Sequence, residues 1–164
     1  MVKLNMSISK KATKLVCILA AGTGSRMGEY AEVVNKSLLP VNFKSSLTRI
    51  IESFPENSQF IIATGYKHKV IDQFIKKKFK NPNVRTFYTG LNSDIVERIK
   101  KSSKYSKKYL LICYGDTLID ININEYIKFF MSNPKKITVA SYQLDSSFGI
   151  FDIKKKNQII DFKE

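Results

Sequence analysis

Residues Ile18–Val41 read ILAAGTGSRMGEYAEVVNKSLLPV, and the rest of the chain is interpreted around them. An apolar run ends at a glycine-rich turn, Gly22–Gly28, which also carries Arg26, and Lys36 follows just ahead of a Leu-Leu-Pro-Val sequence. Continuous apolar runs are typical of buried parallel strands, and a glycine turn after such a strand lets backbone N–H groups approach phosphate oxygens. The stretch therefore predicts a strand that brings backbone donors and two cations to a ligand with several phosphates.

The spacing of the glycines in Gly22–Gly28 is neither the dinucleotide fingerprint GxGxxG nor a Walker A loop, and no GKS or GKT follows. A P-loop ATPase is therefore not expected. Thr23 and Ser25 add hydroxyl donors, and the planar fork of Arg26 suits a phosphate. From the glycines alone, an ordinary strand-to-helix turn with a surface arginine is an equally open interpretation.

The apolar pattern along the chain alternates between strand-like and helical spacing. Strands are predicted at Leu15–Ala21, Gln59–Thr64, Val84–Tyr88 and Tyr109–Tyr114, followed by Ile137–Tyr142, Phe148–Ile153 and Ile159–Phe162. Helices are predicted to begin at Ser45 or Ser46, near Lys69, at Asn92 or Ser93, and at Asn122 or Asn124, with a further helical turn around Glu29–Val33. Pro40 predicts an extended Lys36–Val41. The alternation predicts an α/β fold, a three-layer sandwich with a mainly parallel, Rossmann-like sheet.

Asp116 follows Gly115 at the end of the fourth predicted strand. In open parallel sheets the ligand lies beyond the carboxyl ends of the strands, so this aspartate and the glycine turn belong to the same edge. Asp116 either caps the next turn or holds a divalent cation, and opposite a phosphate-binding turn magnesium is favoured. Asp120 is interpreted as an acid near a helix rather than a second ligand.

Composition limits the class of protein. The chain has 164 residues, 43% of them apolar, which indicates one globular domain over residues 1–164 with a basic leader at 1–13. No stretch approaches the roughly 18–20 apolar residues that span a bilayer, so no membrane partner is expected. Cys17 and Cys113 lie in apolar runs without a CxxC pairing and are interpreted as buried thiols. A cytoplasmic protein is expected.

The net charge of +14 raises the question of a nucleic-acid partner. Cations cluster in Arg98–Lys108 and Lys76–Lys80, and the usual explanation for such runs is a solvated face. No helix-turn-helix, zinc-finger or RNP-type motif accompanies them, so nucleic-acid binding is not the expected main function. His68 is interpreted as a surface or capping residue.

Several motifs together resemble the sugar-phosphate nucleotidyltransferase family. They are LAAGTGSRM, NKSLLPV, YGDTLIDININEYI, FGIFDI and IIDFKE, in the family's order from about Leu15 to Glu164. The subgroup closest in look is glucose-1-phosphate cytidylyltransferase, which has similar GYKHKVI, TGLNSD and RIK sequences. The resemblance implies a fold of the nucleotide-diphospho-sugar transferase type. It also implies transfer of a nucleotide from an NTP, with CTP weakly favoured, to a sugar 1-phosphate or similar phosphorylated metabolite, releasing pyrophosphate. Such enzymes serve nucleotide-sugar and polysaccharide biosynthesis, and a homo-oligomer is possible.

The resemblance also implies roles for individual residues. The catalytic residues would be Arg26, Lys36 and Asp116, with Asp116 holding Mg²⁺. The nucleotide would be bound by Ala21, Gly22, Thr23, Gly24, Arg26, Lys36 and Gly90. The sugar phosphate would lie beside Gly149 and Glu164.

Two departures from the family pattern leave a second hypothesis open. Ile95-Val96-Glu97 stands where the cytidylyltransferases have Thr-Gly-Gly, and Glu164 stands where the family continues with Lys-Pro. The family's second magnesium aspartate lies in that continuation, so the expectation is a domain without the family's C-terminal part. The alternative is a catalytically incomplete, nucleotide-binding remnant that acts as a regulator or partner subunit.

Overall fold

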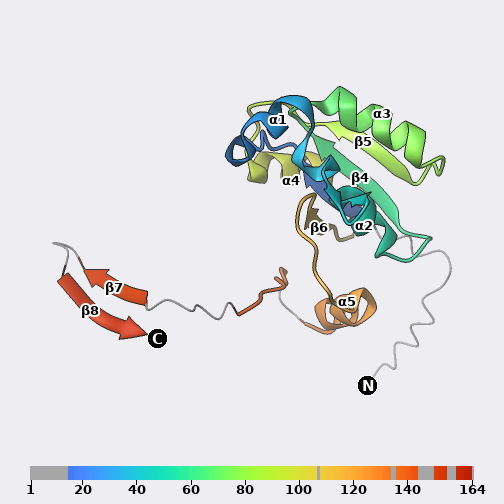
Figure 1. Ribbon diagram of the computed structural model, residues 1–164. Coiled ribbons are helices and arrows are strands. Elements are labelled where there is room, and N and C mark those ends of the chain that lie inside the picture. The colour runs from blue at the N-terminus through green and yellow to red at the C-terminus, as the bar shows by residue number, and fades with distance from the viewer. Residues whose placement is uncertain (1–14, 107, 134–135, 144–149, 155–157, 164) are drawn as a thin grey trace, which may run out of the picture. The chain divides into compact units, whose positions relative to one another are not determined.

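The computed structural model describes residues 15–106, 108–133, 136–143, 150–154 and 158–163 (Figure 1). Two compact units make up the chain, unit 1 (Met1–Ile121) and unit 2 (Asn122–Glu164). The elements of unit 1 are β1 Leu15–Ala20, the 3₁₀ turn η1 Ser25–Met27, α1 Glu29–Val33, the 3₁₀ turn η2 Lys36–Leu38, β2 Pro40–Val41, β3 Lys44–Ser45, α2 Ser46–Glu52, β4 Gln59–Thr64, α3 His68–Lys78, β5 Val84–Tyr88, α4 Ile95–Ser103 and β6 Leu111–Tyr114. Those of unit 2 are α5 Ile123–Ser132, β7 Ile150–Lys154 and β8 Gln158–Lys163. That residues 1–164 form a single domain stays a prediction.

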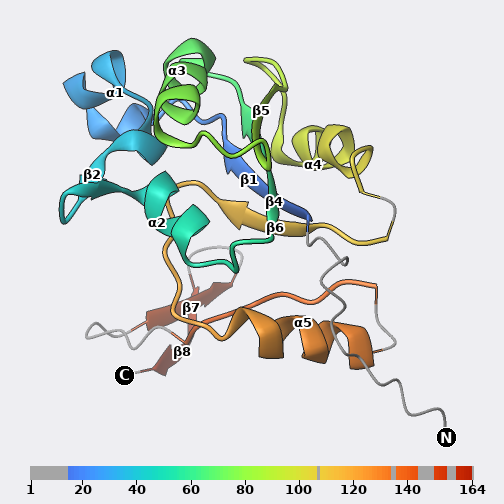
Figure 2. The same cartoon turned by 90° about the vertical axis from the view of Figure 1, so that its right-hand side faces the viewer.

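Parallel strands form the main sheet of unit 1 in the order β5-β4-β1-β6. Helices α2 and α3 lie against one face of this sheet and α4 against the other (Figure 2). Because both faces are covered, a strand in the middle has no solvent side, and β1 reads as the unbroken apolar run LVCILA. The predicted α/β fold with three layers and a mainly parallel sheet is confirmed.

The core of unit 1 lies between the sheet and its helices. Its largest fully buried apolar side chains are Val16, Ile18, Leu47, Ile62 and Ile71. Burying one such side chain stabilises a fold by about 1.5–3 kcal/mol. Leu47 belongs to α2, which begins where predicted, because the side chain of Ser45 accepts a hydrogen bond from the Thr48 N–H. The buried Leu47 therefore anchors α2 in this core.

Most element positions in unit 1 agree with the prediction. The bounds of β4 and β5 and the short helix α1 are as predicted, and α3 begins at His68, one residue early. Helix α4 corrects its predicted start, because its cap is Asp94, whose side chain accepts from the Glu97 N–H, and neither Asn92 nor Ser93. An aspartate one position later has the same capping ability, and the apolar spacing alone did not separate the candidates.

The segment Lys36–Val41 is only partly extended. Lys36–Leu38 forms the turn η2, capped by the side chain of Asn35, and the extended part begins at Leu39. Proline fixes its own φ, has no N–H to donate, and restricts the residue before it, which here is Leu39, but it leaves earlier residues free to turn. The prediction of an extended Lys36–Leu38 is therefore wrong.

Unit 2 contains helix α5 and an antiparallel pair of strands, β7 and β8. Asn122 caps α5 as predicted, and the Tyr126 hydroxyl donates to the carbonyl of Thr138 at 2.8 Å. The predicted strand Ile137–Tyr142 is wrong, because the described residues 136–143 form none. The side chains of Ile137, Val139 and Tyr142 are largely exposed, so this alternating pattern has no sheet face to cover.

The two cysteines carry free thiols. Cys17 is fully buried on β1, and Cys113 on β6 is half-buried. Burial raises the pKa of both thiols, that of Cys113 to about 12, because a thiolate loses its hydration there. Both therefore stay protonated near neutral pH. The interpretation of a buried thiol is confirmed for Cys17, whereas Cys113 is only partly buried.

Within the described ranges, no helix has the length and hydropathy needed to cross a bilayer.

Candidate functional site

The glycine turn begins directly after β1. Gly24 and Gly28 have positive φ angles of 70° and 55°, a backbone region that side chains with a Cβ rarely adopt. The Met27 N–H donates to the Gly24 carbonyl at 2.8 Å and closes the turn η1. The glycines therefore fold the chain back on itself and leave the Arg26 side chain exposed at the end of the sheet.

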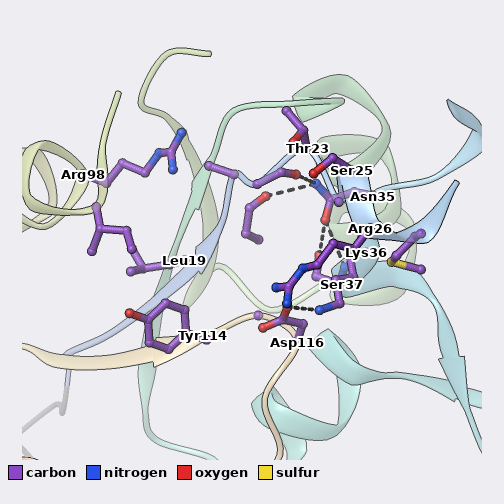
Figure 3. A pocket seen from close by; sticks show the side chains of 17 residues that line it. Leu19, Thr23, Ser25, Arg26, Asn35, Lys36, Ser37, Arg98, Tyr114 and Asp116 are labelled. Carbon is purple, nitrogen blue, oxygen red and sulfur yellow. Dashed lines mark hydrogen bonds and ion pairs between the residues drawn. The ribbon is translucent and has the colours of Figure 1, made fainter. Parts of the chain in front are cut away.

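A cavity of about 290 Å³ opens beyond the carboxyl ends of β1 and β6 (Figure 3). The two strands are neighbours in the sheet, so the turn that follows one and the Gly115-Asp116 pair that follows the other meet at one edge. The lining residues are Leu19, Ala20, Ala21, Gly22, Thr23, Gly24, Ser25, Arg26, Met27, Asn35, Lys36, Ser37, Ile95, Arg98, Tyr114, Gly115 and Asp116. The meeting of these two strand ends was expected from the sequence.

Lys36 and Asp116 form an ion pair across the cavity floor. Lys36 Nζ lies 2.7 Å from Asp116 Oδ2 (Figure 3), and the Thr117 hydroxyl donates to Oδ1 at 3.3 Å. The hydrogen bond from Lys36 holds the pKa of Asp116 below its usual range, although partial burial acts in the opposite direction. Near neutral pH the site therefore presents a carboxylate whose neighbouring cation comes from the protein.

The donor set at the cavity suits a divalent cation only in part. Within the residues that the structure describes, no three His, Cys, Asp or Glu side chains gather as a metal site. Asp116 supplies one carboxylate, and magnesium in phosphate-transferring sites typically takes one or two carboxylates together with oxygens of the substrate's phosphates. The residues present therefore fit a magnesium ion that arrives with a phosphorylated ligand.

Arg98 lines the cavity from α4, on the side away from Lys36 (Figure 3). Its Nη2 makes one long contact, 3.4 Å, to the carbonyl of Leu91, and its Nε is buried with no hydrogen-bond partner in the described chain. Sequence reasoning placed Arg98 in a solvated basic run. Arg98 follows the Asp94 cap by one helical turn, and a residue in the first turns of this helix lies near the end of the sheet. This spacing was the signal for its place in the cavity wall.

Most of the predicted site residues line this one cavity. They are Ala21, Gly22, Thr23, Gly24, Arg26, Lys36 and Asp116. Gly90 does not line it. Gly90 lies in the loop after β5 with a φ of 105°, and its carbonyl oxygen is 2.9 Å from where a Cβ on Gly65 would stand. Gly149 and Glu164 lie outside the described residues, and all these roles stay predictions.

Other predicted features are less closely tied to the cavity. His68 opens α3, with its ring 4.5 Å from that of Tyr88, in keeping with a place at a helix entrance. Asp120 is exposed and does not line the cavity. Sequence reasoning also missed Asn35 and Ser37, two buried polar residues that do.

Comparison with known proteins finds relatives that are named as nucleotidyltransferases. Glucose-1-phosphate cytidylyltransferase of Salmonella typhimurium is 28% identical over 173 residues, covering 90% of this chain and 67% of that protein. D-glycero-alpha-D-manno-heptose 1-phosphate guanylyltransferase of Campylobacter jejuni is 25% identical, covering 90% and 66%. The chain thus spans about two thirds of the length of these relatives.

A solved structure shows the same fold. The crystal structure of HddC from Yersinia pseudotuberculosis in complex with GMP-PN superposes with a TM-score of 0.65 at 20% identity, covering 93% of this chain and 69% of that one. The fold is that of the nucleotide-diphospho-sugar transferases. The model of the nucleotidyl transferase family matches residues 15–164, nearly the whole chain. The chain belongs to the sugar-phosphate nucleotidyltransferase family.

Proposed function

We propose that this chain transfers a nucleotide from an NTP to a sugar 1-phosphate or a similar phosphorylated metabolite and releases pyrophosphate. The observation that carries the proposal is the cavity at the ends of β1 and β6. It holds a glycine turn, two cations that belong to different elements, Arg26 and Lys36, and the carboxylate of Asp116. Such a set can bind a triphosphate and screen the repulsion between two phosphorylated substrates.

The reaction needs little proton transfer. A phosphate monoester has a second pKa of about 6, so an oxygen of the acceptor phosphate is already charged near neutral pH. That oxygen forms a bond to the α-phosphorus, the bond from this phosphorus to the bridging oxygen of the β-phosphate breaks, and pyrophosphate leaves with the electron pair. Lys36 and Arg26 hold the two anions in line and neutralise the charge that gathers in the transition state.

Magnesium is part of the proposal. Asp116 would hold it, and the ion would supply positive charge to the phosphate oxygens. The Lys36 ammonium already lies against the carboxylate at 2.7 Å. It would turn from Asp116 toward a phosphate when the nucleotide binds, so one movement frees the carboxylate and brings a cation to the reacting group.

Arg98 supports a proposal about the base. Its guanidinium makes one long contact through Nη2, and its buried Nε has no hydrogen-bond partner in the described chain. A guanidinium only donates hydrogen bonds, so it suits a base edge that presents acceptors. Cytosine offers O2 and N3, and guanine offers O6 and N7. We favour CTP, with GTP as its competitor; relatives named cytidylyl- and guanylyltransferase support that pair, whereas other relatives are named adenylyltransferases. We also propose that Gly149 and Glu164 lie beside the sugar phosphate, that the chain forms a homo-oligomer, and that the protein is cytoplasmic.

A pyrophosphate assay tests the function. The protein is mixed with Mg²⁺, each of the NTPs and a panel of sugar 1-phosphates, and Arg26→Ala and Asp116→Ala should each lower release by at least about a hundredfold. Arg85→Ala is the matched control, because Arg85 is an exposed arginine of β5 outside the cavity. NTP binding without release from any pair leaves the remnant hypothesis standing, and no NTP binding overturns the nucleotide site itself.

A further inference from the structure

Asn35 is a buried polar side chain that ties together segments far apart in the sequence. Its Nδ2 donates to the carbonyl of Ala20 at 3.2 Å and to that of Tyr66 at 3.1 Å, with Gly22 O further away at 3.5 Å. These carbonyls lie at the end of β1 and in the loop after β4. Only 2% of Asn35 is exposed, so its amide contributes to the fold of this edge rather than to the surface.

The other end of the same side chain sets the position of Lys36. Asn35 Oδ1 accepts from the Ser37 N–H at 3.0 Å and from the Ser37 hydroxyl at 2.8 Å. These bonds cap the turn η2, and Lys36 is its first residue. The backbone that carries the Lys36 ammonium is thus fixed relative to β1 and the glycine turn by one amide group.

Ser46 continues the chain of contacts to the second wall of the cavity. Its hydroxyl lies 3.0 Å from the carbonyl of Ser37 and 2.9 Å from that of Gly115, and it is buried at the first turn of α2. Gly115 directly precedes Asp116. The single proton of this hydroxyl is shared between the two carbonyls. It thereby links η2 to the end of β6, and with it the backbone of Lys36 to that of Asp116.

We infer that Asn35 and Ser46 are positioning residues of the proposed transferase, forming with Ser37 a buried clamp that holds Lys36 and Asp116 at the spacing the reaction needs. The inference rests on the proposed function. The bonds within η2, Leu38 N–H to Asn35 O and Leu39 N–H to Lys36 O, are local, so the turn is held against other segments by the side chains of Asn35 and Ser46 together with the bond from the Ser46 N–H to the Leu39 carbonyl at 3.3 Å. The clamp acts on backbone, so the two functional side chains keep the freedom to exchange partners.

A pair of neighbouring serines separates positioning from stability. Ser46→Ala removes the hydroxyl that links η2 to Gly115. Ser45→Ala removes the N-cap of α2, because the Ser45 hydroxyl bonds to Thr48 and not to the cavity wall. Both serines are buried. Ser46→Ala should lower kcat about tenfold or more with KM for the NTP within about twofold, since a misplacement of about 1 Å costs up to about a hundredfold. Ser45→Ala should lower Tm with kcat nearly unchanged, and Ser46→Thr should recover kcat.

A second readout does not depend on turnover. Mn²⁺ affinity is measured by electron paramagnetic resonance with cytidine 5′-(α,β-methylene)triphosphate bound, and it should weaken in Ser46→Ala and not in Ser45→Ala. Asn35→Ala should show the same pattern as Ser46→Ala where it folds. The clamp is overturned if wild type is active and the two serine variants lose kcat in proportion to their loss of Tm. If wild type binds Mn²⁺ and nucleotide without turnover, the clamp is overturned when the two serine variants lose Mn²⁺ affinity in proportion to their loss of Tm. A wild type that neither releases pyrophosphate nor binds Mn²⁺ with nucleotide overturns the proposed function and the clamp together.

Discussion

Single residues set the charge of the candidate site, and the Lys36–Asp116 pair does so most directly. Both side chains are partly exposed, at 42% and 34%, so solvent screens the pair and its strength is modest. Its importance is in what it does to the carboxylate. A lysine that stabilises the charged form keeps Asp116 ionised near neutral pH, which its proposed role in holding Mg²⁺ requires.

Replacing Lys36 by Met should raise the pKa of Asp116. The ammonium that favours the charged form is lost, and partial burial, which favours the neutral form, remains. Because the wild-type pKa is lowered, its contribution to stability is present above the unfolded pKa and is lost as the pH falls through the folded value. Lys36→Met should therefore lose less stability on acidification. Carbon-13 NMR titration of the aspartate carboxyls measures the shift. Lys44→Met, which breaks the separate Lys44–Glu52 ion pair, should leave the pKa of Asp116 unchanged.

The thiol of Cys113 should be nearly inert in the folded protein at pH 8. Its pKa of about 12 leaves very little of the reactive thiolate, and unfolding returns the group to its ordinary value near 9. Labelling with a chromogenic disulfide in Cys17→Ala should be slow in buffer and fast in urea. Rapid labelling of the folded protein would contradict the burial of this thiol.

At the scale of elements, side-chain caps mark the starts of α2, α4 and α5. Asp94 accepts from the Glu97 N–H at 2.7 Å and starts the helix that carries Arg98. Lys101 then joins the carbonyl of Thr89, the hydroxyl of Ser93 and the carboxylate of Glu97. Helix α4 and the loop before it are thus held as one piece, which fixes the direction from which Arg98 reaches the cavity.

Asp94→Ala should lower the free energy of unfolding by about 1 kcal/mol, because the cap of α4 is lost. Urea denaturation followed by circular dichroism measures it. Asn92→Ala is the control, since Asn92 is exposed and does not cap the helix. Equal losses in the two variants would show that the cap does not set the stability of this helix.

The elements also show what could be predicted from sequence. The bounds of Gln59–Thr64 were predicted without error, because its buried centre, Phe60–Ala63, is an unbroken apolar run. The strand predicted at Leu15–Ala21 ends at Ala20, and the one predicted at Tyr109–Tyr114 begins at Leu111. The turn η2 was missed because the effect of Pro40 was extended too far back along the chain, although the Asn35 side chain caps the turn through the nearby Ser37 N–H. Arg98 was missed because a charged side chain on an amphipathic helix reads the same way whether it faces solvent or a cavity. The strand predicted at Ile137–Tyr142 failed because alternation alone does not supply a partner strand.

For the whole molecule, the net charge of +14 acts on every anionic ligand. An NTP carries several negative charges, and the cavity presents Arg26, Lys36 and Arg98 to it. Long-range attraction of this kind raises association rates and is screened by salt, with a Debye length near 10 Å at 0.1 M.

Nucleotide binding should therefore weaken several-fold between about 50 mM and about 200 mM NaCl. Calorimetric titration with CTP at each salt concentration measures the change in Kd. Binding of the uncharged nucleoside cytidine, which meets the same cavity without phosphates, should change little. A CTP affinity independent of salt would mean that contacts to the base and sugar, rather than to phosphate, account for most of the binding free energy.

Tyr114 lies half-exposed in the wall of the cavity (Figure 3), in a chain that contains no tryptophan. The protein therefore has no tryptophan fluorescence. A tryptophan placed at residue 114 would be the sole emitter of its kind, and its light would come from the cavity alone. The fluorescence of this tryptophan would report ligand binding in the cavity without a label, a coupled enzyme or a product.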